Sequence, residues 1–449
     1  MDSITITPSK PIYAEITPPG SKSITNRALA IAAVARGESL LVGALDSEDT
    51  QVMMDSLRKA GISVVHDPEN SEICVQGCGG VFPVSAENMT NLFCANSGTT
   101  IRFLTAMCAN SHGNFRLDGV ERMRQRPLGD LLDGLRQLGV TVESEFQNDC
   151  PPVLLRADGI PGGCASIPGN VSSQFLSGLL MAVPGARKET EIRVTGGLVS
   201  RPYIDMTIAV MRAFGIIVEE PTENTFRIPA AQVYQGTRYV IEPDASAASY
   251  FFASAAVAGG EITVRNLTKN ALQGDVGFCE CLAKMGCSVE YLPDAIRVSR
   301  TPETPLRGID VDMHFISDTA QTLAVVALFA DSPTTIRNVA NMRVKETDRI
   351  HAVVTELRKF GVRADEFEDG MTIYPLPPEI LENTENLKSL QNLEKTIPPV
   401  EIATYRDHRM AMSFAVAGLR LPGVTILDPG CTVKTYPNFF ADFEKVKSK

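Results

Sequence analysis

Two cations and several hydroxyl groups stand at the start of a strongly apolar segment of this chain. Residues 18–27 read PPGSKSITNR, and the run ALAIAAVARG follows them. A phosphate loop of the Walker type needs a Gly directly before its Lys and another Gly five residues upstream; Ser21 precedes Lys22 and Ile16 stands at the leading position, so that motif is absent. What remains is a helix start with free N–H groups and the charges of Lys22 and Arg27, which suits an anionic ligand. An ordinary capped helix with two solvated cations is the alternative.

Five further segments begin with polar residues and continue as a helix that is apolar on nearly every side. They read NSGTTIRFLTAMCANSHG, NVSSQFLSGLLMAVPG, DASAASYFFASAAVAGG, SDTAQTLAVVALFADSP and RDHRMAMSFAVAGLRLPG. A helix of this kind has to be buried on all sides, so we expect six inner helices with polar groups at their N-termini. These polar residues are Lys22, Ser23, Arg27, Asn96, Ser97, Thr99, Ser172, Ser173, Gln174, Asp244, Asp318, Arg406, Asp407, His408 and Arg409.

The cations in this set are informative because a positive charge is normally unfavourable at the N-terminus of a helix. Six unrelated helix caps would explain the Ser and Asp residues, but not the cations. If three inner helices run parallel in each of two domains that face one another, six positive helix ends meet at one cleft. We therefore predict a cleft that attracts small anions.

A second series of helices repeats along the chain with a regular period. Five amphipathic segments each end in a Gly and continue as a short apolar strand, and the intervals between their glycines are 78, 76, 71 and 75 residues. The 449 residues accommodate six such units, the last of which uses NFFADFEKVKSK as its helix. Each unit is expected to supply one inner helix, one outer helix and some strands. The five glycines are Gly61, Gly139, Gly215, Gly286 and Gly361.

Composition limits the classes of partner. A chain of 449 residues is expected to form two or more domains. Its net charge of −11 disfavours nucleic acid and membrane surfaces, so small anions bound by a local basic cluster are expected. The start of the chain has no basic region followed by an apolar core, and no run of eighteen apolar residues occurs. We therefore expect a soluble protein without a targeting segment.

The cysteines do not have the spacing of a metal site. Ten Cys are scattered along the chain, and none of them forms a C-x-x-C pair. Cys279 and Cys281, with Cys287, come nearest to a cluster, but residues two apart on a helix point to different sides. We expect no metal, no cofactor and reduced thiols in a cytoplasmic protein.

Several long motifs resemble the 3-phosphoshikimate 1-carboxyvinyltransferase family, the enolpyruvyl transferases of the shikimate pathway. They are PGSKSITNRA, NSGTTIRF, ERMRQRPLGDL, VSSQFLSGLLM, VSRPYIDMT, NMRVKETDRI, RDHRMAM and DPGCTVKTYPNFF, and they occur in order over the whole chain. The resemblance implies an α/β (α+β) fold, a two-domain inside-out α/β barrel of six βαβαββ repeats, three per domain. Residues 1–21 with 243–449 would form domain one and residues 22–242 domain two, with the active site in the interdomain cleft. A monomer is expected.

The resemblance also implies the reaction and the residues that bind its substrates. Members move the enolpyruvyl group of phosphoenolpyruvate to the 5-hydroxyl of shikimate 3-phosphate, through a tetrahedral intermediate that expels phosphate. Both substrates are anions, and the planar fork of Arg suits carboxylate and phosphate. The residues implied for shikimate 3-phosphate are Lys22, Ser23, Arg27, Ser172, Ser173, Gln174, Ser200, Asp318, Asn341 and Lys345. Those implied for phosphoenolpyruvate are Lys22, Gly98, Arg126, Gln174, Arg349, Arg409 and Lys434.

The reaction needs proton transfer, for which the sequence offers three candidates. Asp318, at the expected start of an inner helix, is the candidate base for the hydroxyl, with a helix cap as its alternative role. Glu346 is the candidate acid toward the enol carbon, with a surface salt bridge as its alternative. Lys22 could equally donate to the departing phosphate, so the assignments stay open. His408 is expected to assist another group rather than act as the primary acid.

Four positions depart from the family pattern and concern the shape of the phosphoenolpyruvate pocket. Phe103 replaces a common Pro, Ser97 a common Ala and Ser317 a common Pro, while Arg406 occupies a variable place. Gly98 should nevertheless leave room for glyphosate, so competitive inhibition by this compound is expected. Residues 377–399 are rich in Asn and Glu and are expected to be a surface insertion without chemistry.

Two other functions are compatible with this fold. The sister enolpyruvyl transferases that act on a UDP-amino sugar carry Asn after the first Lys and usually a Cys in the mobile loop. Here Ser23 follows Lys22, and the loop LDGVERMRQRPLGD has no Cys. A non-catalytic anion-binding protein of the same fold would be expected to lose an acid or a base, whereas Asp318 and Glu346 are both present.

Overall fold

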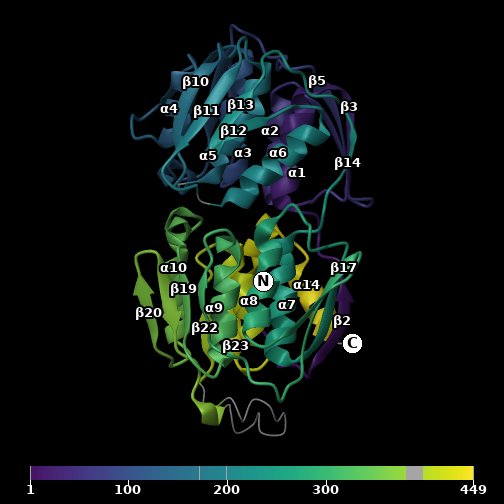
Figure 1. The fold of residues 1–449 in the computed structure, drawn as a ribbon, viewed down its shortest axis with the longest axis vertical. Coiled ribbons are helices and arrows are strands. Elements are labelled where there is room, and N and C mark those ends of the chain that lie inside the picture. The colour runs from purple at the N-terminus through teal and green to yellow at the C-terminus, as the bar shows by residue number, and fades with distance from the viewer. Residues whose placement is uncertain (1, 171, 199, 381–397, 448–449) are drawn as a thin grey trace. The chain divides into compact units, whose positions relative to one another are not determined.

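The computed structural model of the chain describes residues 2–170, 172–198, 200–380 and 398–447. The chain divides into two compact units (Figure 1): Met1–Pro19 with Pro243–Lys449 form unit 1, and Gly20–Glu242 form unit 2. Most of the insertion expected at residues 377–399 lies outside the described residues.

In its described residues, unit 2 forms three four-stranded sheets that share one pattern. Each sheet has a parallel pair of strands followed by two antiparallel neighbours. Parallel neighbours need a crossover connection, which the helices supply. The first sheet has the order β14-β3-β5-β4 (Arg238–Val240, Arg36–Val42, Glu72–Cys78, Ser63–Asp67). The second is β6-β7-β9-β8 (Met89–Phe93, His112–Asp118, Val153–Asp158, Thr141–Ser144), and the third is β10-β11-β13-β12 (Gly163–Pro168, Thr190–Thr195, Thr225–Ile228, Glu219–Thr222).

The connections of unit 2 carry two kinds of helix. The inner helices are almost completely buried: α1 (Lys22–Val34), α3 (Gly98–Met107) and α5 (Ser173–Ala182). The outer helices keep an exposed polar face: α2 (Glu48–Lys59), α4 (Gly129–Gln137) and α6 (Arg201–Ala213). The inner and outer helices expected from the sequence are confirmed, because a helix that is apolar all round has to be covered on every side.

Two sheets of unit 1 follow the same pattern within the described residues, and the third has a parallel pair with one antiparallel neighbour. Two have four strands: β16-β17-β15-β2 (Ser288–Tyr291, Ala295–Arg300, Gly260–Arg265, Ile12–Ile16) and β18-β19-β21-β20 (Asp310–Asp312, Thr334–Arg337, Gly370–Ile373, Ala364–Phe367). The third has three strands, β1-β23-β22 (Ser3–Thr5, Val424–Leu427, Val400–Ile402). Sheets with crossover helices make the fold α/β. Every described sheet is open, so the barrel and the six repeats remain predictions.

The inner helices of unit 1 pack against one another: α7 (Ala245–Ala258), α9 (Ala320–Val326) and α13 (His408–Ala417). Its outer helices are α8 (Phe278–Lys284), α10 (Arg349–Arg358) and α14 (Phe439–Lys447). Three 3-10 turns carry predicted site residues: η5 (Ser317–Thr319), η7 (Ala340–Val344) and η9 (Pro429–Lys434). Asp318 therefore lies in a short turn before α9 and not in the helix itself.

The five predicted stop glycines end the outer helices α2, α4, α6, α8 and α10. Their φ angles are 87° at Gly61, 84° at Gly139, 87° at Gly215, 106° at Gly286 and 77° at Gly361. Only Gly adopts this conformation without strain, so these residues determine where the helices stop.

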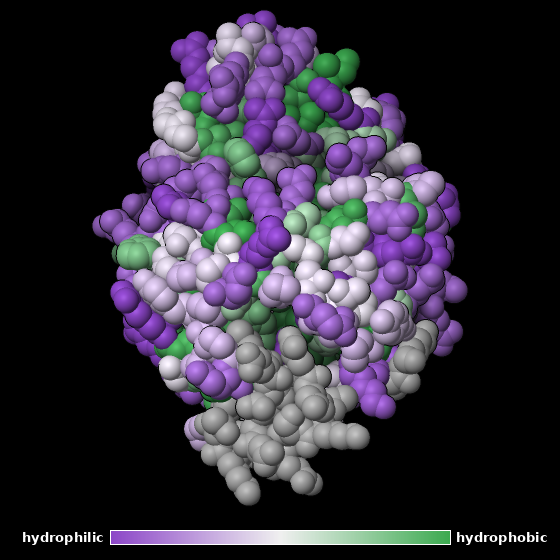
Figure 2. All heavy atoms as spheres, turned by 60° about the horizontal axis from the view of Figure 1, so that its bottom comes forward, coloured by the Kyte–Doolittle hydropathy of each residue, from purple (hydrophilic) through white to green (hydrophobic). Residues whose placement is uncertain are grey.

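The surface is mainly polar on the face shown in Figure 2, where hydrophobic residues occur singly or in small groups. The apolar side chains of the inner helices lie inside instead. Within the described ranges, no helix combines the length and the apolarity that crossing a bilayer requires.

Candidate active site

Polar side chains tie together the first turns of the three inner helices of unit 2. Asn26 in α1 donates from Nδ2 to the Thr99 hydroxyl in α3 at 2.7 Å. Arg102 in α3 donates from Nη1 to Gln174 Oε1 in α5 at 2.6 Å. The N-termini of these helices therefore lie together, and their positive ends share one region of unit 2. Serine hydroxyls cap all three helices: Ser21, Ser97 and Ser172.

Gly98, the first residue of α3, lies between two guanidinium groups. A Cβ atom at this position would be 2.7 Å from Arg102 Nη1 and 2.8 Å from Arg126 Nη2. Arg126 comes from the loop between β7 and α4 and donates from Nη1 to the backbone and side-chain oxygens of Asn96, at 3.3 and 3.4 Å. It is 4% exposed and has no carboxylate partner among the described residues. A buried guanidinium without a counter-ion beside a helix N-terminus is suited to an anionic ligand.

Arg27 is the second buried cation of unit 2 without a carboxylate partner in the described part of the chain. Its guanidinium donates to Thr207 Oγ1 at 2.7 Å, to Ser177 Oγ at 3.2 Å and to the carbonyls of Ser23 and Tyr203 at 3.0 and 3.4 Å. Burial, opposed by Tyr203, lowers the pKa of Arg27 to about 10. The group is therefore still a cation at neutral pH.

The other predicted residues of unit 2 also lie at helix starts. Lys22 Nζ is 3.3 Å from Asp49 Oδ2 in α2, an ion pair that the sequence did not suggest. Ser173 begins α5 and is buried. Ser200 precedes α6 in the left-handed conformation, with a φ of 57°, and is 6% exposed. A non-glycine residue is strained in that conformation, and such strain is found most often at functional sites.

In unit 1, Arg349 at the start of α10 donates to three carboxylates. Its Nε and Nη2 donate to the two carboxylate oxygens of Asp407 at 2.6 and 3.2 Å. Nη2 also donates to Glu346 at 2.8 Å, and Nη1 donates to Asp318 at 3.1 Å. Burial lowers the pKa of Arg349, but the three carboxylates raise it more, and the net shift is upward. Asp407 also caps α13, because its Oδ1 accepts from the Arg409 amide at 2.9 Å. The sequence indicated Asp407 only as a polar helix start.

Asp318 lies among three cations. Its Oδ1 is 3.1 Å from Arg349 Nη1 and 3.7 Å from Lys345 Nζ, and its Oδ2 is 3.0 Å from Arg409 Nη2. The N-cap residues of η5 and α9 are Ile316 and Thr319, so Asp318 is the cap residue of neither element.

A further buried carboxylate, Asp275, interacts with Arg409. Ser246 in α7 donates from Oγ to Asp275 Oδ2 at 2.7 Å and lies 3.4 Å from Arg409 Nη2. Gln273 donates to the same Asp275 oxygen at 2.9 Å. Burial, and after it the charge of Asp318, raises the pKa of Asp275, while Arg409 and the hydrogen bonds act in the opposite direction. Sequence reasoning missed this group, because 163 residues separate Ser246 from Arg409.

The remaining predicted residues of unit 1 either join the network of ion pairs around Arg349 and Asp318 or lie at its edge. Glu346 pairs with Arg349 and lies 3.9 Å from Lys434 Nζ. The side chains of this Glu and Arg are 8% and 2% exposed, so the alternative of a surface salt bridge at Glu346 is wrong. Asn341 donates from Nδ2 to Ser317 Oγ at 3.1 Å, and His408 is 1% exposed at the start of α13. Among the described residues, no group of three His, Cys, Asp or Glu could hold a metal ion.

The four departures from the family pattern have different surroundings. The Phe103 ring centroid is 5.1 Å from the Arg27 guanidinium, so this substitution contacts a residue predicted for shikimate 3-phosphate. Ser97 caps α3, and Ser317 accepts from Asn341. Arg406 has a φ of 56° and lies just before the cap of α13. Arg102, absent from the predicted set, could have been found from its position one helical turn after Gly98.

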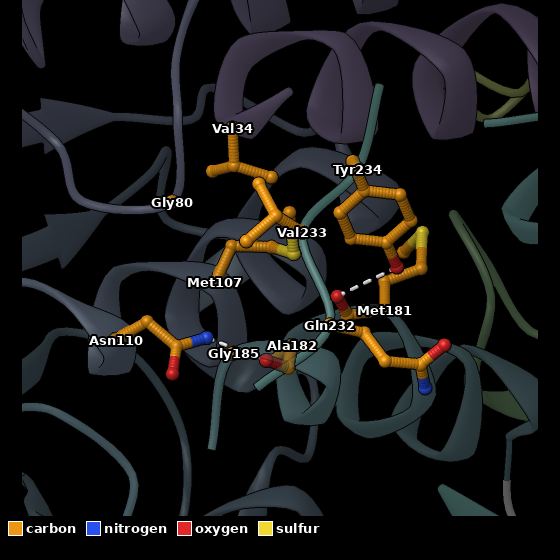
Figure 3. A pocket seen from close by; sticks show the side chains of 10 residues that line it. All are labelled: Val34, Gly80, Met107, Asn110, Met181, Ala182, Gly185, Gln232, Val233 and Tyr234. Carbon is orange, nitrogen blue, oxygen red and sulfur yellow. Dashed lines mark hydrogen bonds between the residues drawn. The ribbon is translucent and has the colours of Figure 1, made fainter. Parts of the chain in front are cut away.

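Two pockets lie away from these residues. In unit 2, a cavity of about 20 Å³ has Val34, Met107 and Met181, from the last turns of α1, α3 and α5, on its walls (Figure 3). Tyr234 donates to the Met181 carbonyl there at 2.9 Å. The cavity has room for a water molecule but not for a phosphate ester. In unit 1, a pocket of about 370 Å³ lies beside Phe329, after α9. Neither pocket includes a predicted site residue.

Comparison with known proteins gives one consistent result. The family model described as EPSP synthase (3-phosphoshikimate 1-carboxyvinyltransferase) matches residues 6–443. A 3-phosphoshikimate 1-carboxyvinyltransferase of Nostoc punctiforme is 46% identical over 99% of this chain and 99% of its own length. The chloroplastic 3-phosphoshikimate 1-carboxyvinyltransferase of Arabidopsis thaliana is 43% identical over 99% of this chain and 84% of its own. The solved structure of EPSP synthase from Acinetobacter baumannii superposes with a TM-score of 0.79 at 26% identity, covering 99% of this chain and 97% of that one.

Proposed function

Because the chain belongs to the 3-phosphoshikimate 1-carboxyvinyltransferase (EPSP synthase) family, we infer that the cations described above in unit 2 and in unit 1 bind its two anionic substrates. The enzyme transfers the enolpyruvyl group of phosphoenolpyruvate to the 5-hydroxyl of shikimate 3-phosphate, giving 5-enolpyruvylshikimate 3-phosphate and phosphate. The reaction belongs to the shikimate pathway, which supplies aromatic amino acids. The observation that carries the site assignment is the position of Gly98 between two buried guanidinium groups.

The phosphoenolpyruvate site is proposed to use residues of both units. In unit 2, the absence of a Cβ at Gly98 lets the Arg126 guanidinium approach the start of α3 closely, and Arg126 has only Asn96 as a hydrogen-bond partner among the described residues. In unit 1, Arg349, Arg409 and Lys434 belong to the network around Asp318 and Glu346. The remaining members of this proposed set are Lys22 and Gln174.

For shikimate 3-phosphate, the proposal rests mainly on Arg27 and Ser200. Arg27 is a buried cation that has only neutral partners, and Ser200 has a strained backbone. Both features are unfavourable in the free protein and are explained if a ligand uses them. The proposed set also includes Lys22, Ser23, Ser172, Ser173, Gln174, Asp318, Asn341 and Lys345.

The proton transfers are proposed to involve Asp318 as the base for the hydroxyl, with Glu346 and Lys22 as acids. Both Asp318 oxygens accept from arginines, which is the arrangement of an ionised carboxylate. Glu346 is buried beside Arg349 and near Lys434, where it can exchange a proton with a bound anion. His408, buried at the start of α13, is proposed to assist these groups.

The larger arrangement is part of the same proposal. Residues 1–21 with 243–449 and residues 22–242 would be the two domains, each built from three βαβαββ repeats of an inside-out barrel, with the active site in the cleft between them. The strand pattern shared by the sheets supports the repeat. We further propose a cytoplasmic monomer that needs no cofactor and is inhibited by glyphosate; the ten free thiols fit a reducing compartment.

Release of phosphate from phosphoenolpyruvate, measured with each acceptor separately, tests the function. We expect release with shikimate 3-phosphate and none with a UDP-amino sugar. Release only with the UDP-amino sugar would assign the chain to the sister activity. Binding of both anions without release would indicate a non-catalytic protein.

A further inference from the structure

The loop that carries Arg126, residues 119–128, begins beside the segment that leads into Gly98. Strands β6 and β7 are parallel neighbours, and the Cys94 amide after β6 donates to the Asp118 carbonyl at the end of β7 at 2.7 Å. Ligands of α/β proteins bind where connections leave the carboxyl ends of adjacent parallel strands. The conformation of this loop therefore decides where Arg126 lies relative to Gly98.

The side chain of Asp118, at the end of β7, accepts hydrogen bonds from residues of this loop and so holds its two parts together. Oδ1 accepts from the Gly119 amide at 2.8 Å and from Arg124 Nε at 2.9 Å. Oδ2 accepts from Arg124 Nη2 at 2.6 Å and from Arg116 Nη1 at 3.1 Å. The two bonds from Arg124 form a bidentate pair, the geometry in which a guanidinium holds a carboxylate most strongly.

The environment of Asp118 stabilises its ionised form. The residue is 7% exposed, and burial alone would raise the pKa of Asp118. Hydrogen bonds from Arg124 and the Gly119 amide, with the charges of Arg124 and Arg116, nevertheless bring this pKa below its ordinary value. The pair with Arg124 is therefore an ion pair at neutral pH.

Two arginines of the same loop are used differently. Arg124 is paired with Asp118, whereas Arg126, two residues later, has no carboxylate partner in the described part of the chain. Between them, Gln125 belongs to a short 3-10 turn whose first residue, Met123, is fully buried. The ion pair and the buried Met123 hold the loop at two points, and Arg126 follows directly after them.

We propose that Asp118 is a positioning residue for phosphoenolpyruvate, because its bidentate pair with Arg124 fixes the loop that holds Arg126 beside Gly98. The inference rests on the proposed function. Without the pair, the loop has to be ordered when the substrate binds, and that cost lowers the affinity for phosphoenolpyruvate. The residues proposed for shikimate 3-phosphate lie on other elements and keep their geometry.

The test compares Asp118→Asn, Arg124→Gln and the double variant by steady-state kinetics with each substrate varied in turn. We expect the KM for phosphoenolpyruvate to rise about tenfold in each single variant, which corresponds to about 1.4 kcal/mol. The KM for phosphoenolpyruvate of the double variant should not exceed the higher of the two single-variant values, because both substitutions remove the same interaction. The KM for shikimate 3-phosphate should stay within about twofold. Arg124→Lys keeps the positive charge but cannot form the bidentate pair. Its KM for phosphoenolpyruvate should lie between those of wild type and Arg124→Gln.

A matched control is available on the helix that follows the loop. Asp133 pairs with Arg136 in α4 at 2.6 Å and lies outside the loop, so Asp133→Asn should change neither KM. If wild type is active with shikimate 3-phosphate, an unchanged KM for phosphoenolpyruvate in Asp118→Asn would overturn the inference. An equal rise in the KM values of both substrates would overturn it as well. A wild type that releases no phosphate with shikimate 3-phosphate would overturn the proposed function itself, and this inference with it.

Discussion

Asp318 and Arg409 form an ion pair of 3.0 Å between the turn before α9 and the second residue of α13. The two residues are 91 positions apart in the sequence. The pair joins the proposed base to a proposed phosphoenolpyruvate ligand within unit 1. Removing this carboxylate therefore affects both proton transfer and the position of Arg409, and kinetics can separate the two effects.

Asp318→Asn should lower turnover by roughly 10² or more, the scale of a lost general base, because the amide keeps the shape but cannot take a proton. Binding of shikimate 3-phosphate should stay within a few fold. Turnover is measured at saturating substrates and binding by calorimetry. Asp310→Asn, which breaks an exposed ion pair with Arg337, is the control and should change neither. Equal losses of turnover and binding would show that Asp318 acts only by position.

Gly98→Ala should weaken inhibition by glyphosate more than it weakens binding of phosphoenolpyruvate. Glyphosate is the longer molecule, so the added methyl group should intrude on it more. That methyl would also lie within 2.8 Å of Arg102 and Arg126, so both guanidiniums have to move and the KM for phosphoenolpyruvate should rise as well. Inhibition kinetics of both proteins give the two constants. A wild type that resists millimolar glyphosate, or equal changes in both constants, would contradict the proposed role of Gly98.

Arg27→Met should separate function from stability. A buried charge without a counter-ion is unfavourable in the folded protein, so its removal should leave the free energy of unfolding unchanged or higher. Ser177 and Thr207 keep a hydrogen bond to each other, at 2.9 Å, when the guanidinium is absent. The KM for shikimate 3-phosphate should rise tenfold or more. Urea unfolding and kinetics check the two parts, and a large loss of stability with an unchanged KM would make Arg27 structural.

Asp275 predicts a pH dependence of stability. Its pKa is raised in the folded protein by burial and by the charge of Asp318, above an ordinary value of about 3.9. Its contribution to stability is therefore fully present below about pH 3.9 and is lost as the pH rises through the folded pKa. In Asp275→Asn this loss is absent, so the unfolding free energy of the variant relative to wild type should increase with pH in that window. The increase is about 1.4 kcal/mol per pH unit at most.

Urea unfolding of the wild type and Asp275→Asn at several values between pH 4 and pH 7 measures this difference. Taking the difference removes the contributions of carboxylates that do not interact with Asp275; the part that remains includes its interaction with Asp318. A difference that does not change with pH would show that Asp275 has the same pKa in the folded and unfolded chains.

Local patterns predicted the elements that position the site. The apolar helices and their serine or aspartate caps depend on residues within one or two turns of each other, as at Ser97 and Asp407. The positive φ of Gly61 and of its four counterparts likewise follows from the helix that each glycine ends. The 3-10 turn at Asp318 was missed, because a single turn has no periodicity to reveal it.

The sequence by itself determined the inner and outer helices and the polar groups at the helix starts, since these depend on short-range periodicity and capping, and its resemblance to a known family implied the α/β class. Only the tertiary structure decided which charges meet. Arg349 pairs with Asp407 across 58 residues, and the Arg102 side chain reaches Gln174 across 72. Such pairs depend on how helices from different parts of the chain pack, and no local pattern encodes that packing. The same is true of Arg27 and Arg126, whose lack of a carboxylate partner among the described residues becomes visible only when the surrounding elements are in place.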